Sequence, residues 1–494
     1  MLSINSWTGI VLLAASPAGT PNAPERPSAS SGSRAVGADL IVGNITGPSN
    51  YGQSEGYVVY SAGATYCNLG SIPAEVFALQ AARHPVLAQG LYRLKIETGT
   101  NYYRLEQISQ KWPFHDFCSL QQGLCGTCAP NCGGCCNYLG VGCSESNSSS
   151  IHGGRAYMGP RYEVNGSTGE FLEPRIQPSN PNTVLNGRLA TRVADIDPAV
   201  QPPGTQYYVE VQVLGRDDAA WGNDRNNASF RRVGSIGPAP NFNISFSGTS
   251  TVREQPALRA WQAADPGVTI VSVDVLNDGI FTVPYAGSVP PPKSGRLLLG
   301  ARATRNVDSS WHYEYVLYNL SSHRAAGSLR VPLGTACAVR NIGFHDVDYH
   351  SGEIQVGTDW TVSMEGGAVA WATEPYDAAN SETANALRWG TMYNFRFDAD
   401  RAPVSGEVEI GLFRPPSFPG DPMAHTLSVP VPSPSPLIAG DLDGDDDVDS
   451  DDVDLIVAVL LGFETERCLI DRADLNGGGV DGSDIQAMVK ILIP

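Results

Sequence analysis

The chain has few basic side chains: 32 Lys and Arg stand against 51 Asp and Glu among its 494 residues, a formal net charge of −19. The absence of a basic stripe argues against nucleic acid as a partner. No apolar run is long enough to span a bilayer, so we expect no membrane span. The sequence also lacks a Gly-x-Ser-x-Gly nucleophile elbow, a Gly-Lys phosphate loop and a His-Glu-x-x-His zinc motif.

The negative charge is concentrated at the C-terminal end. From Ala439 onward, thirteen Asp and two Glu face one Lys and two Arg, a net charge of −12, which leaves −7 for the rest of the chain. Runs of like charge are usually solvated and disordered. Two features of this segment, its spacing and its repetition, indicate more than a solvated linker.

Residues 441–452 place carboxylates where a short loop must present oxygens to a hard cation. Loop positions one, three, five and twelve are all carboxylates: Asp441, Asp443, Asp445 and Asp452. Position seven, Asp447, offers its backbone carbonyl, and Asp449 at position nine can act through a water. Carboxylates this close repel one another unless a cation lies among them. The spacing therefore predicts a Ca²⁺ site.

The pattern occurs twice. Apolar residues after Asp452 fall at the helical spacing i, i+3, i+4 and i+7, and the residues after Asp484 match them position for position. Gly462 is suited to end the first helix. We expect two loop-and-helix units whose apolar faces pack on each other.

Residues 439–494 resemble a type I dockerin module, in which duplicated half EF-hands end in Asp at position twelve. The second loop supplies Asp474, Asn476 and Asp484 but is one residue shorter and lacks the oxygen at position five. The first loop has Asp446 where Gly is expected at position six. The resemblance implies a small all-α module that folds with Ca²⁺ and docks on a cohesin-like partner.

Dockerins read their partner partly through positions ten and eleven. These positions are Ser450-Asp451 in the first loop and Gly482-Ser483 in the second. Because the two pairs differ, the resemblance does not imply two equivalent binding orientations.

The N-terminal 36 residues read as a signal-like, low-complexity segment. Thr8–Ser16 is a short apolar run followed by small residues, as in a signal peptide, although no Lys or Arg precedes it. We expect a secreted, extracellular or cell-surface protein.

Cysteines cluster next. Seven lie between Cys118 and Cys143, and Cys67 makes the number even. Cys125-x-x-Cys128 with Cys132-x-x-Cys135 could hold zinc, but the two pairs are too close together, and disulfides are favoured. Cys337 and Cys468 are left either free or paired with each other.

From Gly37 to Arg414 the sequence reads as β-structure. Apolar residues alternate over Tyr207–Val213, Trp311–Leu317 and Tyr393–Phe397, and 53 Gly and 36 Pro punctuate these runs. Helices are expected only at 74–83, 254–263 and 381–389. We predict a Cys-rich β domain over 37–180, an antiparallel β-sandwich over 181–414, a proline-rich spacer over 415–438 and the helical module over 439–494.

Several phrases of the body also resemble a group of secreted bacterial proteins with no established activity, which often end in dockerin-like tails. These phrases are His84–Lys95, Leu139–Ser144, Gly159–Asn165 and Gly343–Glu353. The resemblance implies secretion and carries no catalytic role.

Three groups in the body are candidates for chemistry. If residues 345–350 form a strand, Asp346, Asp348 and His350 share one face and could hold a metal; otherwise they are a polar strand and turn. The oxygen-rich segment Asp217–Asn227 could bind calcium, although Asn and Asp also gather in turns. The aromatic and acidic segment Trp112–Asp116 could contact a glycan or belong to the core.

Two functions follow, one non-catalytic and one enzymatic. The first is a body without catalytic residues that the calcium module docks onto a cohesin-like or cell-surface partner. The second is a dockerin-bearing glycoside hydrolase acting on polysaccharide, an analogy that rests on the tail alone. A third possibility is that the module caps the chain and recruits no partner.

Overall fold

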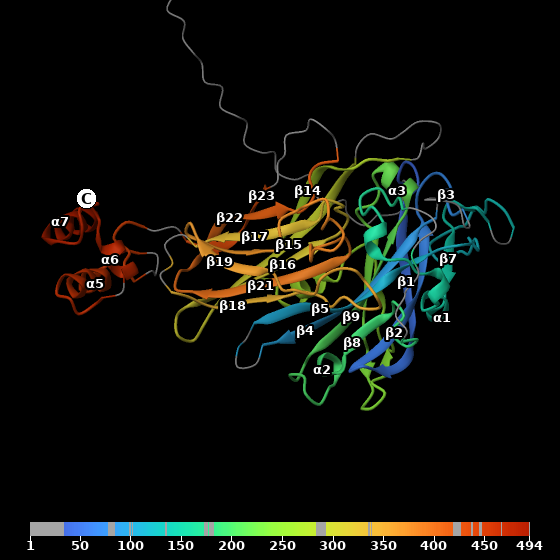
Figure 1. The fold of residues 1–494 in the computed structure, drawn as a ribbon, viewed down its shortest axis with the longest axis horizontal. Coiled ribbons are helices and arrows are strands. Elements are labelled where there is room, and N and C mark those ends of the chain that lie inside the picture. Colours follow the sequence, from blue (N-terminus) through green and yellow to red (C-terminus); the bar gives the residue numbers. More distant parts are fainter. Residues whose placement is uncertain are drawn as a thin grey trace, which may run out of the picture. The chain divides into compact units, whose positions relative to one another are not determined.

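Extended strands dominate the structure, as the alternating segments predict (Figure 1). The computed structural model describes residues 34–77, 84–97, 100, 102–133, 136–171, 176, 182–282, 293–333, 336, 338–417, 426–435, 438–443, 447–465 and 467–493. All pairs between named strands are antiparallel, and four larger sheets account for most of the strands. The mostly β fold class is confirmed.

Two sheets enclose the first core. Sheet 1 contains β1 (Leu40–Ser54), β2 (Tyr57–Asn68), β7 (Ser144–Asn147) and β8 (Leu189–Arg192). Sheet 2 has the order β13 (Thr251–Val252), β10 (Ala228–Arg232), β9 (Gln206–Leu214), β4 (Val86–Ile96) and β5 (Tyr103–His115). Leu40 and Tyr60 of sheet 1 share an apolar core with Leu91 and Val211 of sheet 2.

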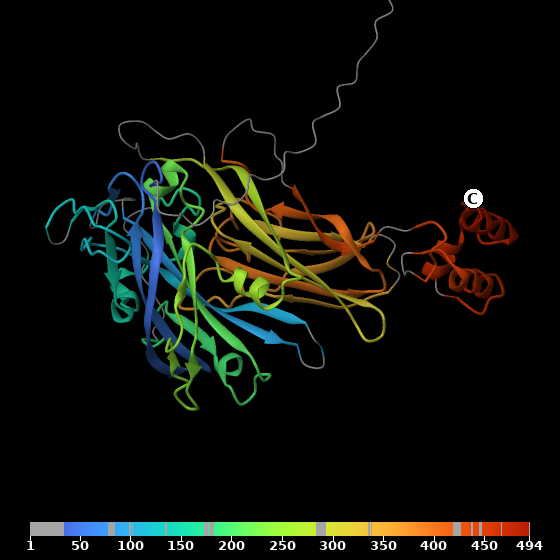
Figure 2. The ribbon, with the colours of Figure 1, turned by 180° about the vertical axis from the view of Figure 1, so that it is seen from behind.

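Two further sheets form a β-sandwich in the second half of the chain (Figure 2). Sheet 3 has the order β14 (Thr269–Gly279), β15 (Lys293–Arg305), β16 (Trp311–Asn319), β21 (Thr391–Ala399) and β18 (Val339–His345). Sheet 4 has the order β19 (Thr361–Glu365), β20 (Ala368–Ala372), β17 (Ala326–Pro332), β22 (Pro403–Leu412) and β23 (Thr426–Pro434). Tyr315 and Phe395 of sheet 3 pack with Val369 and Val408 of sheet 4.

Sheets 2 and 3 also pack on each other. Tyr92 and Tyr208 of sheet 2 share a third apolar cluster with Val316 of sheet 3 and with Trp261 of α4 (Leu258–Ala264). β9 and β16 are consequently buried on both faces along nearly their whole length. Alternation is typical of strands with one buried face, so it does not by itself reveal this second contact.

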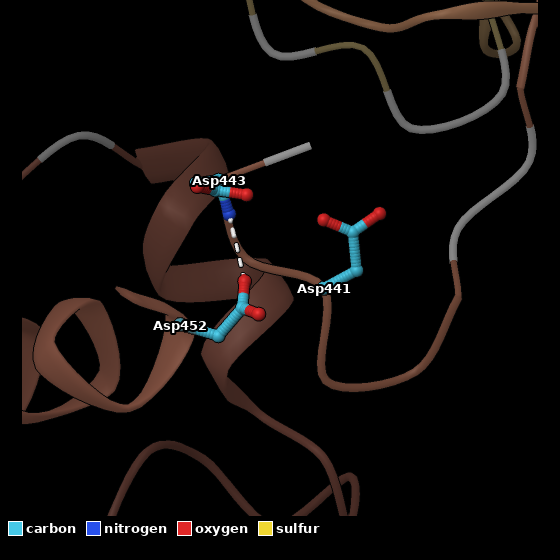
Figure 3. Close-up of side chains that lie close together, drawn as sticks. All are labelled: Asp441, Asp443 and Asp452. Carbon is cyan, nitrogen blue, oxygen red and sulfur yellow. Dashed lines mark hydrogen bonds between the residues drawn. The ribbon is translucent and has the colours of Figure 1, made fainter. Parts of the chain in front are cut away.

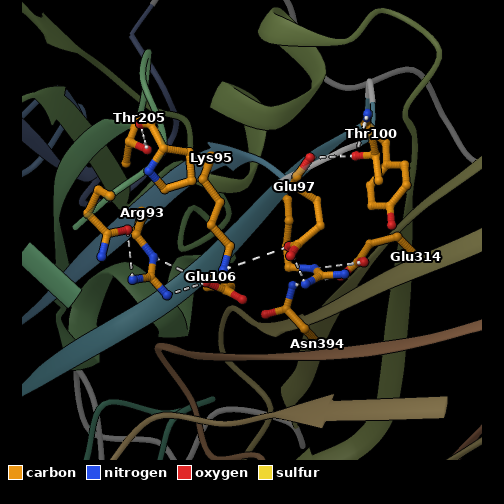
Figure 4. A network of polar contacts seen from close by, with 12 residues as sticks. Arg93, Lys95, Glu97, Thr100, Glu106, Thr205, Glu314 and Asn394 are labelled. Carbon is orange, nitrogen blue, oxygen red and sulfur yellow. Dashed lines mark hydrogen bonds and ion pairs between the residues drawn. The ribbon is translucent and has the colours of Figure 1, made fainter. Parts of the chain in front are cut away.

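Part of the contact between sheets 2 and 3 is polar (Figure 4). Arg104 of β5 donates to Glu314 of β16 at 2.9 Å, and both side chains are buried. His312 lies between Glu314 and Asp398, at 3.2 and 2.6 Å. Burial alone would lower the pKa of His312, but its hydrogen bonds to these two carboxylates raise it. Charges buried in this contact are therefore paired.

Smaller elements complete the body. They are β3 (Ala74–Glu75), β6 (Tyr138–Leu139), β11 (Ser235–Ile236), β12 (Ile244–Ser245), α1 (Ser149–His152), α2 (Val193–Ile196), α3 (Arg216–Trp221) and the 3-10 turns Arg155–Tyr157 and Arg161–Glu163. The division expected near residue 180 does not coincide with a break in pairing, because β9 pairs with β4 and β8 pairs with β2.

The cysteines between β5 and β7 form disulfides, as expected. The bridges among described residues are Cys67–Cys125, Cys128–Cys143 and Cys132–Cys136, and Cys118 is also disulfide-bonded. Each member of the two Cys-x-x-Cys pairs that is described bonds to another cysteine, so the zinc interpretation is wrong. Cys135, Cys337 and the side chain of Cys468 lie outside the described residues.

The helix expected at 381–389 is absent, and the one expected at 74–83 is contradicted over its described residues, 74–77. Ala74–Glu75 is a strand paired with β6, although residues 78–83 of that expected helix lie outside the described part. Residues 381–389 form turns, with Ala384 and Leu387 buried against Ala325 and Ala326. Helix propensity there is overridden by packing against the ends of strands. The third expected helix corresponds to α4.

The prediction of a proline-rich spacer over residues 415–438 is wrong in part, because residues 426–434 form β23. Val429 and Val431 are buried in the core between sheets 3 and 4, and Pro430 and Pro432 alternate with them opposite β22. An edge strand tolerates proline because the missing N–H can face away from its partner. The same alternation that looked like an extended tether therefore completes a sheet.

Three helices follow β23: α5 (Ser450–Leu460), α6 (Arg467–Ala473) and α7 (Gly482–Leu492). Ile456 and Val459 of α5 share a small apolar cluster with Met488 of α7 and Ala473 of α6. The helical periodicity around 453–460 and 485–492 places α5 and α7 at the expected residues. No helix in the described part of the chain is both long and apolar enough for a membrane crossing.

Candidate metal centre

Asp452 ties the acidic loop to the start of α5 (Figure 3). Its carboxylate is fully buried and accepts backbone N–H groups from Asp443 at 3.1 Å and Asp449 at 2.9 Å, and also from Leu442. Asp449 is the N-cap and accepts from the amide of Asp451, which completes a capping box. One carboxylate therefore fixes both the first residues of the loop and the first turn of the helix.

Carboxylate oxygens gather around Asp452. One oxygen from each of Asp441, Asp443 and Asp452 lies within 4.8 Å of the others, and Asp447 and Asp449 form a second such group with Asp452. Asp441 is fully buried and Asp443 is exposed. Oxygen ligands from one loop at this spacing suit Ca²⁺, which takes six to eight of them. Asp445 lies outside the described residues.

Asp441 also faces a cation from the body. Arg401, between β21 and β22, donates to Asp441 Oδ2 at 2.8 Å, and neither side chain is exposed. Arg472 of α6 donates to the carbonyl of Leu442 at 2.8 Å and reaches Asp400 at 3.4 Å. Burial lowers the pKa of Arg472, while Asp400 opposes that shift. Sequence reasoning missed Arg401 and Arg472, because no local spacing relates them to the loop.

The second loop repeats the cap. Asp484 accepts the amides of Leu475 at 2.9 Å, Asn476 at 3.2 Å and Asp481 at 2.9 Å, and Asp481 is the N-cap of α7. Hydrogen bonds from Ser483 lower the pKa of Asp481. The start of α7 is therefore built as that of α5 is.

The rest of the second loop differs. Both oxygens of Asp474 accept backbone N–H groups, from Gly477 at 2.7 Å, Gly478 at 3.0 Å and Gly479 at 3.0 Å. Asn476 donates to Ser483 and accepts from Gly478. Among the described residues of this loop, no three acidic side chains converge on one point.

The oxygen ligands of the first loop therefore suit a cation better than those of the second loop do. In the first loop, three to five carboxylates crowd together, and their mutual repulsion would be relieved by a divalent ion. In the second, no such crowding exists among the described residues, and three backbone amides stabilise the negative charge of the position-one carboxylate, as a backbone nest holds an anion. Asp441, Asp443, Asp447 and Asp452 fit Ca²⁺, whereas Asp474, Asn476 and Asp484 fit a loop held by hydrogen bonds.

The other sequence candidates are not brought together. β18 ends at His345, so residues 346–350 do not form the strand that would align them. Asp346 accepts from Asn385, Asp348 pairs with Arg192 at 2.6 Å, and His350 contacts the carbonyl of Gln110. The proposed metal or catalytic face at Asp346, Asp348 and His350 is therefore absent from this described segment.

The two remaining candidates are structural. Asp217 and Asp218 lie in α3 and are buried, and Asp218 accepts from the amide of Leu40 and from Asn227. These contacts use both carboxylate oxygens of Asp218, and Asp224 pairs with Lys293 at 2.6 Å. Trp112 and Phe114 are buried in β5, so they belong to the core and present no face to a glycan.

Comparisons with known proteins add no family. No family model matches the sequence, and no curated protein matches it. Among solved structures, a mutant oxalate decarboxylase of Bacillus subtilis aligns over 78% of this chain and 79% of its own, at 9% identity and a TM-score of 0.10. A TM-score this low carries no argument, so function rests on the geometry of the chain itself.

Proposed function

We propose that this is an exported calcium-binding protein whose residues 439–494 form a dockerin-like module that docks the β-rich body onto a partner. The observation that carries the proposal is the group Asp441, Asp443 and Asp452, whose oxygens approach within 4.8 Å beside a capped helix. Disulfides in the Cys-rich segment are compatible with export, because they persist in oxidising compartments.

Ca²⁺ supplies charge neutralisation at this loop. The carboxylates of Asp441, Asp443, Asp445 and Asp452 hold it, with the carbonyl of Asp447 as a further ligand. Asp452 then acts twice, since it binds the ion and keeps the amides that fix the start of α5. Metal binding to such a loop contributes directly to its folding free energy.

The docking surface we propose is the pair of apolar faces that α5 and α7 leave exposed. Val457 on α5 and Val489 on α7 are 39% and 48% exposed, and Leu461 and Ile493 after them are 63% and 75% exposed. These positions are related by the same repeat that relates the two caps. Apolar side chains gathered on one surface mark interaction sites more often than scattered ones do.

A partner resembling a cohesin would contact this surface together with loop positions ten and eleven. Those positions differ between the repeats, with Ser450 and Asp451 in one and Gly482 and Ser483 in the other. The two helices therefore offer unequal polar contacts around matched apolar ones. We expect one orientation of the partner to bind more tightly than the other.

Hydrogen exchange on the full chain tests the calcium part. We expect amides of α5 to gain protection when Ca²⁺ replaces a chelator, and the Asp443→Asn variant to lose that gain. Asp454→Asn is the matched control, because it removes an exposed carboxylate of α5 outside the loop. If the exchange protection of the α5 amides in the wild-type chain were the same with and without Ca²⁺, the proposal would be refuted.

Binding to a panel of immobilised cohesin domains tests the docking part. We expect retention in Ca²⁺ that is lost in chelator and in the Val457→Asp, Val489→Asp double variant. Exposed Val362→Asp, on edge strand β19, is the control and should bind as wild type does. Calcium-dependent protection without retention on any cohesin would leave a calcium-stabilised end of the chain and refute docking of this class.

A further inference from the structure

A small cavity in the body lies among basic side chains. Its volume is about 10 Å³, and Arg161, His323, Arg388 and Arg414 contribute to its lining. The other lining residues are Tyr162, Val164, Ser322 and Trp389. About 10–15 Å³ of space is what one water-sized guest requires. No carboxylate is among the residues that line it.

Arg388 leaves donors without partners at this cavity. Its side chain is 3% exposed, and Nη2 donates to the carbonyls of Ser381, Glu382 and Ala384. Nε and Nη1 are buried and have no hydrogen-bond partner among the described residues. Nη1 has only an ion pair, at 3.5 Å, to Glu382. Buried donors of a charged group left in this state cost free energy, so a bound acceptor would be stabilising.

Three guanidinium groups and no carboxylate line the cavity. Arg161 donates to the side-chain oxygen of Gln110 and to two backbone carbonyls, all neutral acceptors. Arg414 pairs with Glu382 at 2.8 Å, the same carboxylate that faces Arg388. Arg388 and Arg414 thus share one carboxylate, whose side chain is 38% exposed.

Glu353 is a weak counter-charge to Arg161 and Arg388. Burial raises the pKa of Glu353 to about 7, although Arg161 and Arg388 oppose this shift. Burial, Arg414 and Arg388 together lower the pKa of His323 to about 3, so its imidazole is neutral and can still donate one N–H. Arg388 also lowers the pKa of Arg414, after burial. The shifts of His323 and Arg414 follow from burial first and from neighbouring arginines second.

We propose that this cavity binds a small monovalent inorganic anion, chloride in the first instance. A water molecule must donate two hydrogens as well as accept them, and the available groups here are mainly donors. An anion only accepts, and it compensates the charge of Arg161, Arg388 and Arg414.

The anion would join distant parts of the chain. Arg161 follows the Cys-rich segment, His323 follows β16, Arg388 precedes β21 and Arg414 follows β22. Arg161 already lies over the ring of Trp389, 4.7 Å from its centroid. A shared anion therefore stabilises the contact between the first and second halves of the body, and this role is independent of the calcium module.

Bromide locates the site directly, because it scatters anomalously and substitutes for chloride. Crystals of the full chain grown in sodium bromide should show an anomalous peak within hydrogen-bond distance of Arg388 Nε or Nη1. Water density there without an anomalous peak, or bromide peaks confined to the protein surface, would overturn the proposal.

Thermal unfolding gives a second readout in solution. At constant ionic strength, replacing gluconate by chloride should raise the Tm by roughly 1–3 °C, with a logarithmic dependence on chloride concentration. Arg388→Gln should abolish this shift, whereas Arg330→Gln, at an exposed ion pair, should keep it. Equal Tm values in chloride and gluconate for the wild-type chain would also overturn the proposal, whether or not the Arg388 variant folds.

Discussion

The two acidic loops share a helix cap and differ in everything before it. In each, the last Asp binds three backbone amides, from Leu442, Asp443 and Asp449 for Asp452 and from Leu475, Asn476 and Asp481 for Asp484. At position one, however, Asp441 faces other carboxylates and Arg401, whereas Asp474 is held by three glycine amides. The cap determines the helix, and the residues inside the loop determine whether a cation is needed.

The largest effect that separates the loops should come from Arg401→Ala. Without calcium, this change leaves buried Asp441 without the guanidinium 2.8 Å away, and we expect a loss of about 3–5 kcal/mol in local stability. Saturating Ca²⁺ should shrink that loss, because the ion replaces the missing positive charge. The loss of local stability is measured by the protection of the Leu442 and Asp443 amides against hydrogen exchange, with and without Ca²⁺.

Arg330→Ala is the control for this experiment. Arg330 pairs with Glu409 at 3.3 Å, but both side chains are more than a third exposed, so we expect a loss of about 0–1 kcal/mol. The account is contradicted if Arg401→Ala costs no more than Arg330→Ala, or if Ca²⁺ does not reduce its cost.

The second-largest difference between the two loops should be in their affinity for Ca²⁺. Removing one ligand charge in the first loop with Asp443→Asn should weaken Ca²⁺ binding about 10–100-fold, since affinity follows ligand charge. The same change at Asp474 should leave affinity within about twofold, because no other acidic side chains of the described second loop converge with that carboxylate. Calorimetric titration of both full-length variants measures the difference, and equal losses would refute it.

Substitution of a glycine in the second loop should change the stability of α7 and leave Ca²⁺ binding by the first loop unchanged. Gly479 has φ +88° with no neighbour within 4 Å, so an added Cβ meets backbone strain and no clash. Gly479→Ala should destabilise α7 by about 1–2 kcal/mol and leave Ca²⁺ affinity unchanged. Gly482→Ala, at the first residue of α7 in open space, is the matched control and should be neutral or slightly stabilising. Exchange protection of α7 measures both, and an equal loss in the two variants would argue against strain.

The smallest effect concerns the cap of α7. Hydrogen bonds from the hydroxyl and amide of Ser483 lower the pKa of exposed Asp481, whereas the equivalent position in the first loop is Asp451, which has no hydroxyl. A depressed folded pKa contributes stability above the unfolded value near 3.8 that is lost as pH falls through the folded value. Ser483→Ala should raise the Asp481 pKa toward its ordinary value. Carbon-detected NMR titration measures it, and an unchanged pKa would refute the assignment.

Local pattern explains which parts of this structure were predictable. The alternation in Tyr207–Val213 and Trp311–Leu317 identified β9 and β16, and helical spacing identified α5 and α7. The grouping of Asp441, Asp443 and Asp452 followed from loop spacing, because all three lie on one short segment.

Contacts between segments far apart in sequence were not predictable. Nothing local marks Arg401 as the partner of Asp441, or shows that β9 and β16 are buried on both faces by a facing sheet. The valines of β23 alternate with proline, a composition typical of linkers, so the sequence did not indicate that this segment pairs with β22. In each case, tertiary packing decided what propensity alone could not.

The most direct test of this account is the number of calcium ions that the full chain binds tightly, counted by native mass spectrometry. We predict one ion in the wild-type chain, still one in Asp474→Asn, and none in Asp443→Asn. Two ions in the wild type, one of them removed by Asp474→Asn, would show that the loops are equivalent and contradict the account. No bound ion in the wild type would contradict it altogether.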